Sequence, residues 1–226
     1  LLLGLSLAAV MSGPVAVVQA ERQSGLPLLA ADRWLLAAGW AAYAALYLFA
    51  ADLSYLLGDF LHLDRPAQRA GQLLLLVYAA SVVGAGLSAV WQRWRGPLGG
   101  SAFVVAGGLI GGGAACGLLP FAASPWLLAG LSIAMGLAHA LFLSAARTWL
   151  TGAAAAGRTS LIAGFNNLPN WGAVGGFAGL GVIAWVSNKG DPAFHPRVLG
   201  LIGLLAVVSA GCGWQVGRLA GGGERV

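Results

Sequence analysis

The sequence predicts an all-α fold, a polytopic bundle of about seven transmembrane helices, from two observations on composition and periodicity. Hydrophobic residues make up 59% of the 226 residues and charged residues only 8%, whereas soluble proteins carry roughly 25% charged residues. The apolar residues run in stretches of about 20, the length of a membrane-spanning helix, without the period-two alternation of barrel strands. These observations exclude a soluble globular enzyme and a disordered chain.

Charged and turn-forming residues separate the apolar stretches. Breaks fall after residue 20, at Asp64-Arg65-Pro66 and at residues 188–192. Each stretch between breaks is long enough to cross the hydrocarbon core as a helix, the structure that satisfies every backbone group in lipid. The predicted spans, in chain order, are 1–19, 34–56, 70–91, 99–121, 125–148, 160–186 and 197–217.

Residue 1 is Leu rather than Met, so we expect residues 1–20 to be the end of a preceding transmembrane helix. Residues 21–33 then form a cytoplasmic linker, residues 34–217 a six-helix unit and residues 218–226 a cytoplasmic tail. The alternative is a signal peptide that ends at the small residues before Glu21. Cleavage there would invert the orientation of every later loop.

Basic residues in alternate loops predict the orientation, because Lys and Arg concentrate on the cytoplasmic side. If the first span exits into the cytoplasm, the C-terminus is also cytoplasmic. We expect an integral protein of the plasma membrane, which in a bacterium is the inner membrane. The basic residues occur in ones and twos, so no nucleic-acid partner is expected. Those predicted inside are Arg22, Arg33, Arg93, Arg95, Arg147, Arg158, Arg218 and Arg225, and those outside are Arg65, Arg69, Lys189 and Arg197.

Glycines four residues apart predict close helix packing, because small residues let helix backbones approach each other in lipid. Such pairs occur at Gly107 and Gly111, at Gly172 and Gly176, and at Gly175 and Gly179. Packing is our main interpretation of these glycines, and sliding of one helix along another is the alternative.

The order of loops and helices resembles the C-terminal half of a major facilitator superfamily (MFS) transporter. Residues 84–96 join two spans through a short basic loop, similar to the family's signature of glycine, an acidic residue and basic residues, although Val90 stands in the acidic position. The long helix at 130–149, a loop with Arg158 and a helix rich in Gly and Asn are similar to the family's tenth and eleventh helices. The resemblance implies helices seven to twelve of a transporter whose N-terminal half is absent. Such proteins move small solutes by rocking two halves around a midplane site.

His139 is the first candidate site residue, because an ionisable group within a span is costly and invites a function. It lies near the middle of the 125–148 span and shares a helix face with Ser132, Met135 and Phe142. The family's tenth helix lines the central cavity, so the resemblance implies that His139 and Ser132 face the solute. The alternative is a neutral imidazole held by a neighbouring helix.

Two further candidates lie on the 34–56 span. Tyr43 and Tyr47 follow Trp40 at i, i+3 and i+7 on one face, either as packing or as an aromatic wall that stacks against a ligand. Asp52 lies near the outer end of this span. It is a candidate for proton coupling together with His139, or else it reaches water or caps the helix.

The polar cluster of Asn166, Asn167 and Asn170 surrounds Pro169 in the 160–186 span. Asn166 and Asn170 are four residues apart and share a face, and Pro169 removes one backbone hydrogen bond at about mid-depth. These amides either bind a polar solute or gate the helix, or they make hydrogen bonds between helices.

These residues favour secondary-active transport of a small solute by alternating access, as part of an MFS permease or efflux protein. The expected partners are the solute, the lipid bilayer and the missing N-terminal half. We expect no catalytic residues, no cofactor and no metal. The first alternative is a membrane-embedded enzyme acting on a lipid-linked substrate, with Asp59, His62 and Asp64 as its candidate group. The second is a membrane scaffold subunit that does not transport.

Overall fold

The computed structural model describes residues 30–60, 62–95, 124–155, 157, 159–187, 191 and 193–222. The predicted spans 1–19 and 99–121, most of the predicted linker and the end of the predicted tail lie outside the described residues. Five α-helices and one π-helical turn account for nearly all of the described residues, and no strand occurs among them. The predicted all-α class is therefore confirmed.

The helices are α3 (Ala30–Tyr55), continued by the π-helical turn η1 (Leu56–Phe60), then α4 (Pro66–Arg95), α6 (Pro125–Ala155), α7 (Thr159–Val186) and α8 (Phe194–Gly222). Each contains one predicted span, but four of them begin or end several residues outside it. The difference has a simple cause. The length of an apolar stretch matches the thickness of the hydrocarbon core, whereas the backbone hydrogen bonds of a helix can continue beyond the apolar stretch into polar sequence.

Within the described residues, four segments are long and apolar enough to cross a membrane: Ala30–Asp59, Pro66–Trp94, Trp126–Thr151 and Phe194–Leu219. Helix α7 has 28 residues and a comparable length of roughly 42 Å at 1.5 Å per residue. Helix α7, which carries three asparagines and many glycines, is not among the four. The chain thus has the helices of an integral membrane protein.

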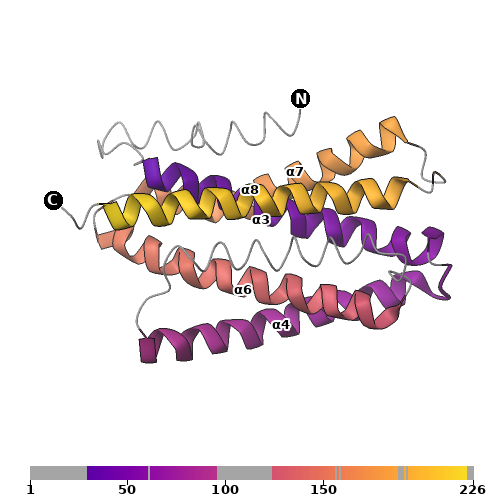
Figure 1. Cartoon of the computed structure of the whole chain (residues 1–226), viewed down its shortest axis with the longest axis horizontal. Coiled ribbons are helices and arrows are strands. Elements are labelled where there is room, and N and C mark those ends of the chain that lie inside the picture. Colours follow the sequence, from indigo (N-terminus) through magenta and orange to yellow (C-terminus); the bar gives the residue numbers. More distant parts are fainter. Residues whose placement is uncertain are drawn as a thin grey trace.

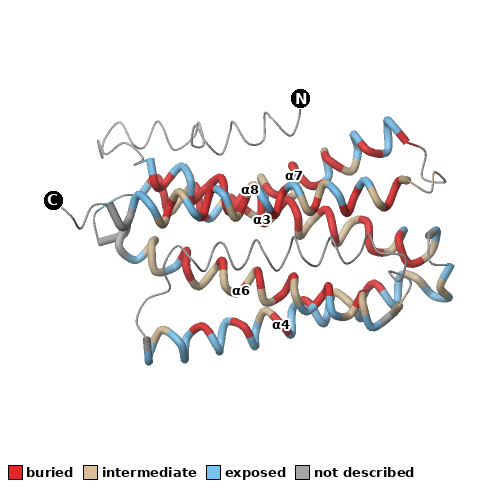
Figure 2. Tube along the Cα trace, viewed as in Figure 1, coloured by how far each residue is buried: buried red, intermediate tan, exposed pale blue. Residues whose placement is uncertain are grey.

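The helices lie side by side along the long axis of the molecule; α4 and α6 run parallel, and the other described helices that follow one another are antiparallel (Figure 1). Helix α3 packs along both α7 and α8, and α4 packs along α6. The contacts between these two groups are sparser. Burial follows the same division: α3 is buried along most of its length, whereas α4 is exposed over much of its surface (Figure 2).

Glycines bring the backbones together at two of the three main helix contacts, α3 with α7 and α4 with α6. A Cβ on Gly176 would lie 2.8 Å from the carbonyl oxygen of Ala44, and a Cβ on Gly172 would collide with Tyr43. On α6, a Cβ on Gly136 would collide with a backbone carbonyl of α4. The predicted packing role of the α7 glycines is therefore confirmed.

Candidate functional site

Two buried aspartates lie near the two ends of α3. Asp32 is fully buried and Asp52 is 3% exposed. They are separated by roughly 30 Å along the helix axis at 1.5 Å per residue, which is about the thickness of a bilayer's hydrocarbon core. Each aspartate contacts a different helix, so α3 is held at both ends.

At one end, the indole nitrogen of Trp149 on α6 donates a hydrogen bond to Oδ1 of Asp32, at 2.9 Å. At the other end, Nδ1 of His195 on α8 lies 3.0 Å and 3.1 Å from the two carboxylate oxygens of Asp52. Both side chains of this second pair are almost fully buried. The buried Ser209 hydroxyl of α8 also donates to the carbonyl of Ala38, at 2.9 Å, and adds a polar tie between α8 and α3.

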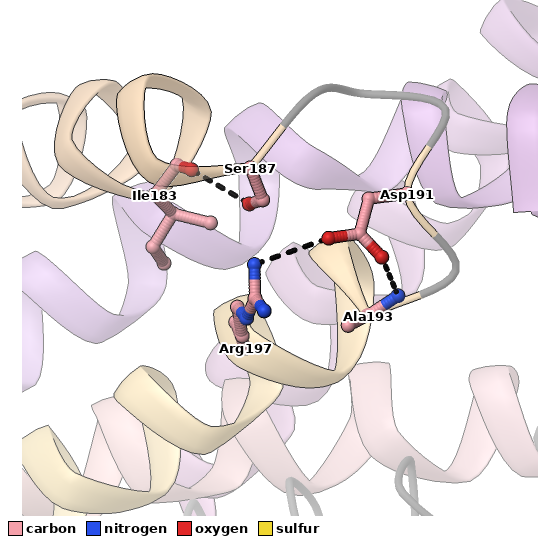
Figure 3. Close-up of polar contacts among 5 residues, drawn as sticks. All are labelled: Ile183, Ser187, Asp191, Ala193 and Arg197. Carbon is pink, nitrogen blue, oxygen red and sulfur yellow. Dashed lines mark hydrogen bonds and ion pairs between the residues drawn. The ribbon is translucent and has the colours of Figure 1, made fainter.

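The turn before α8 places His195 opposite Asp52. One carboxylate oxygen of Asp191 accepts the backbone amide of Ala193 at 2.9 Å, and the other lies 3.2 Å from Nη1 of Arg197 (Figure 3). At the end of α7, the Ser187 hydroxyl donates to the carbonyl of Ile183 at 2.7 Å. These bonds satisfy backbone groups at both helix ends and set the position at which α8 begins.

Tyr43 lies about halfway between the two aspartates, roughly 15 Å along the axis from each. Its ring meets the imidazole of His139 edge to face, with ring centroids 5.2 Å apart and an angle of 76° between the rings. His139 precedes Trp149 on α6 by about 15 Å, so the bond from Trp149 to Asp32 aligns the two helices at this depth. Both side chains are partly exposed. The structure therefore joins two of the predicted site residues at mid-membrane depth.

Tyr47 extends this aromatic surface by one turn of α3. Its ring centroid lies 6.4 Å from that of Phe177 on α7, and Phe177 is 56% exposed. Trp40, on the same predicted stripe, differs from the two tyrosines: it is 3% exposed and packs over Gly175, as the packing interpretation expects. The difference arises because the α3–α7 contact covers one edge of the predicted stripe and leaves the other edge open.

The three asparagines of α7 divide between two environments. Asn166 and Asn170 are exposed and share a helix face with Phe177, as their spacing requires. Asn167 is half-buried and donates from Nδ2 to the carbonyl of Ala163, at 3.1 Å, a local bond that occupies one of its two amide hydrogens. Helix α7 continues through Pro169. No contact between these amides and Tyr43 or His139 is observed among the described residues.

Two predictions about the site are corrected. Ser132 is fully buried rather than facing a cavity, and its hydroxyl has no partner in the described part of the chain. Met135 and Phe142 of the same predicted face are also buried, because this side of α6 is turned into the bundle. Asp52 does not reach water, and it lies roughly 13 Å along α3 from the level of Tyr43 and His139, so Asp52 and His139 form no pair.

Sequence reasoning missed four residues of this arrangement: Asp32, Trp149, Phe177 and His195. Asp32 was assigned to the linker because the predicted span began after it. His195 could have been found, since a buried carboxylate in an apolar helix needs a partner and the chain has only three histidines. The inter-helix contacts of Trp149 and Phe177 have no sequence signal.

The group proposed for an enzyme does not assemble in the described residues. Asp59, His62 and Asp64 are all exposed in the turn between η1 and α4. No three His, Cys, Asp or Glu side chains among the described residues are placed to hold a metal ion.

Comparisons with known proteins add no further constraint, since no family model, no curated protein and no solved structure matches the chain. The fold and the site therefore define a class of protein: an α-helical bundle whose helices are long and apolar enough to cross a membrane. A polar and aromatic cluster lies about halfway along these helices.

Proposed function

We propose that this chain is the C-terminal six-helix half of an MFS-type secondary transporter, and that it moves a small solute across the plasma membrane by alternating access. The observation that carries the proposal is the Tyr43–His139 contact at mid-membrane depth. Ionisable and hydroxyl-bearing side chains are costly at this depth, and where they occur they mark solute or ion pathways. In transporters, the solute site lies near the midplane between helices of different repeats.

The solute-binding surface in this proposal runs from α6 across α3 to α7. His139 and Tyr43 supply an imidazole and a phenol hydroxyl, both able to donate or accept hydrogen bonds. Tyr47 and Phe177 continue the surface as aromatic rings. Asn170, about two turns before Phe177 on α7, adds an exposed amide. In the complete transporter, the missing half would cover this face and close the cavity.

The packing of the helices supports a moving part in this proposal. Helix α3 forms one tightly packed group with α7 and α8, and α4 forms another with α6. Among the described helices, contacts between the groups are sparser than contacts within them, so a small rotation of one group against the other would break few of these contacts. The Tyr43–His139 contact joins the two groups, so a solute bound there would respond to that rotation.

Proton coupling within this half would depend on His139. Asp52 is buried against His195, away from the proposed cavity, and no second acid lies at the level of Tyr43 among the described residues. We therefore place any carboxylate that couples protons to transport in the missing half.

Cysteine accessibility in the native membrane tests the proposed cavity. In a full chain with Cys116 and Cys212 replaced by serine, Asn170→Cys should react with a charged, membrane-impermeant thiol reagent, because a cavity exposes that position to water. The matched control is Val207→Cys on α8, 68% exposed and expected to face lipid. If Asn170→Cys proves as unreactive as Val207→Cys, the face meets lipid and the cavity does not exist.

The functional test uses the full-length protein. His139→Ala should lower solute uptake and change its dependence on pH, whereas Tyr43→Phe, which keeps the ring but removes the hydroxyl, should retain more uptake. Unchanged uptake and unchanged pH dependence in His139→Ala would remove His139 from the site.

A further inference from the structure

A second site lies at the end of the bundle that contains Asp52 and His195. A pocket of about 220 Å³ opens between η1, the first turns of α4 and the first turns of α6. Its walls are mainly leucine side chains from all three elements, including Leu57, Leu73 and Leu128, and its two polar residues are Arg69 and Gln72. The site is thus an apolar slot with a cationic group beside it.

The pocket lies near one end of two segments that are long and apolar enough to cross a membrane, Ala30–Asp59 and Pro66–Trp94. We therefore expect it close to the lipid headgroups. Leu57 follows Asp52 by roughly 8 Å along the helix axis. Arg69 lies one turn into α4, which begins at Pro66. A long basic side chain at this depth places its charge among lipid headgroups while its stem covers apolar surface.

No acidic side chain in the described part of the chain forms an ion pair with the guanidinium of Arg69. Among the described residues the side-chain ion pairs are those of Arg197 with Asp191 and of His195 with Asp52, and the hydrogen bond of Arg69 is from its backbone amide to the carbonyl of Arg65. Arg65 is also exposed and adds a second positive charge one turn away. The acids of the same turn, Asp59 and Asp64, are exposed as well.

The apolar part of the pocket continues along α4. Leu76 lines the pocket, and Val83, Leu87 and Val90 follow it on the same helix face at helical spacing. These three side chains are 59%, 63% and 57% exposed. The pocket and this stripe lie on one apolar face of α4, which begins beside Arg69 and extends to Val90 near the other end of the helix.

We propose that this pocket binds an anionic phospholipid, whose phosphate pairs with Arg69 and whose acyl chain lies in the leucine-lined slot and along the α4 stripe. Arginine presents a planar fork of donors that matches phosphate oxygens, and basic pockets between transmembrane helices bind anionic headgroups. A lipid fits both the cationic group and the apolar stripe, whereas free phosphate would fit only the first. The site is independent of the proposed transport cavity.

The test measures the thermal unfolding midpoint of the full chain in vesicles of phosphatidylcholine alone and in vesicles that also contain phosphatidylglycerol. Phosphatidylglycerol should raise the midpoint of the unaltered protein, and Arg69→Gln should abolish that shift. Arg93→Gln, at the other end of α4 and also exposed, is the matched control and should keep it. Leu76→Trp retains the charge but fills the slot, and should reduce the shift.

Three outcomes would overturn the assignment. The shift could persist in both Arg69→Gln and Leu76→Trp, which would place the lipid elsewhere. It could disappear equally in Arg93→Gln, which would indicate a general charge effect. Inorganic phosphate added to phosphatidylcholine vesicles could reproduce it, which would identify the ligand as a free anion.

Discussion

The pair formed by Asp52 and His195 gives the sharpest quantitative prediction. Both side chains are almost fully buried, at 4% and 3% exposure, so neither can recover its interaction with water when the other is removed. His195→Leu keeps a side chain of similar volume but leaves the Asp52 carboxylate buried without this partner. Breaking a buried pair in this way costs about 3–5 kcal/mol.

The nearby pair of Asp191 and Arg197 provides an internal comparison. Its two atoms are 3.2 Å apart, nearly the same separation, but its side chains are 46% exposed for Arg197 and 33% for Asp191. Exposed pairs contribute about 0–1 kcal/mol. Arg197→Gln should therefore have little effect. The two pairs have similar distances but unequal burial. A larger loss of stability in His195→Leu than in Arg197→Gln would therefore be caused by exclusion of solvent and not by the contact distance.

The assay is reversible unfolding of the purified full chain in mixed micelles of increasing SDS fraction, followed by circular dichroism. The double variant Asp52→Leu with His195→Leu should recover most of the loss, since an apolar replacement for both partners is often neutral or stabilising. A loss below about 1 kcal/mol in His195→Leu, or a double variant whose loss equals the sum of the single losses, would refute the reasoning.

Two other predictions use the same unfolding assay. Gly136→Ala should destabilise the protein by about 1–3 kcal/mol through overpacking against α4. The control Gly130→Ala, whose added Cβ would have nothing within 4 Å, should stabilise α6 by about 0.5–1 kcal/mol. A stabilised Gly136→Ala would contradict the packing argument. Trp149→Phe should lower the free energy of unfolding by about 1.5–3 kcal/mol because it removes the hydrogen bond to the Asp32 carboxylate. In the control Trp34→Phe, the tryptophan replaced is partly exposed and does not make this bond, so the change should be less than about 0.5 kcal/mol. Equal effects of the two tryptophan variants would show that ring volume matters rather than the hydrogen bond.

The helical class and the position of each described helix could be predicted from the sequence, because both depend on the cost of placing backbone and side chains in hydrocarbon. The helix ends could not. Asp32 illustrates the reason: a charged residue ends an apolar stretch but does not end a helix when a neighbouring tryptophan satisfies its carboxylate.

The candidate site was predicted in part. The spacing of Trp40, Tyr43 and Tyr47 placed them on one helix face, either as packing or as a wall for a ligand; Trp40 is buried and the two tyrosines are half-buried. Ser132 was expected to face the solute, but it is buried. Helical periodicity assigns residues to a face but does not say which neighbour covers it.

Composition and hydropathy alone determined that this chain forms long helices for a lipid solvent, because every residue contributes to that free energy independently of the others. Tertiary structure decided which polar residues meet: Asp52 with His195, Asp32 with Trp149, and Tyr43 with His139. These contacts join residues far apart in the chain, and each depends on the rotation and depth of two helices at once. The rotation and depth of each helix depend on how its glycine and alanine surfaces fit those of its neighbours. The sequence of a single helix does not contain this fit.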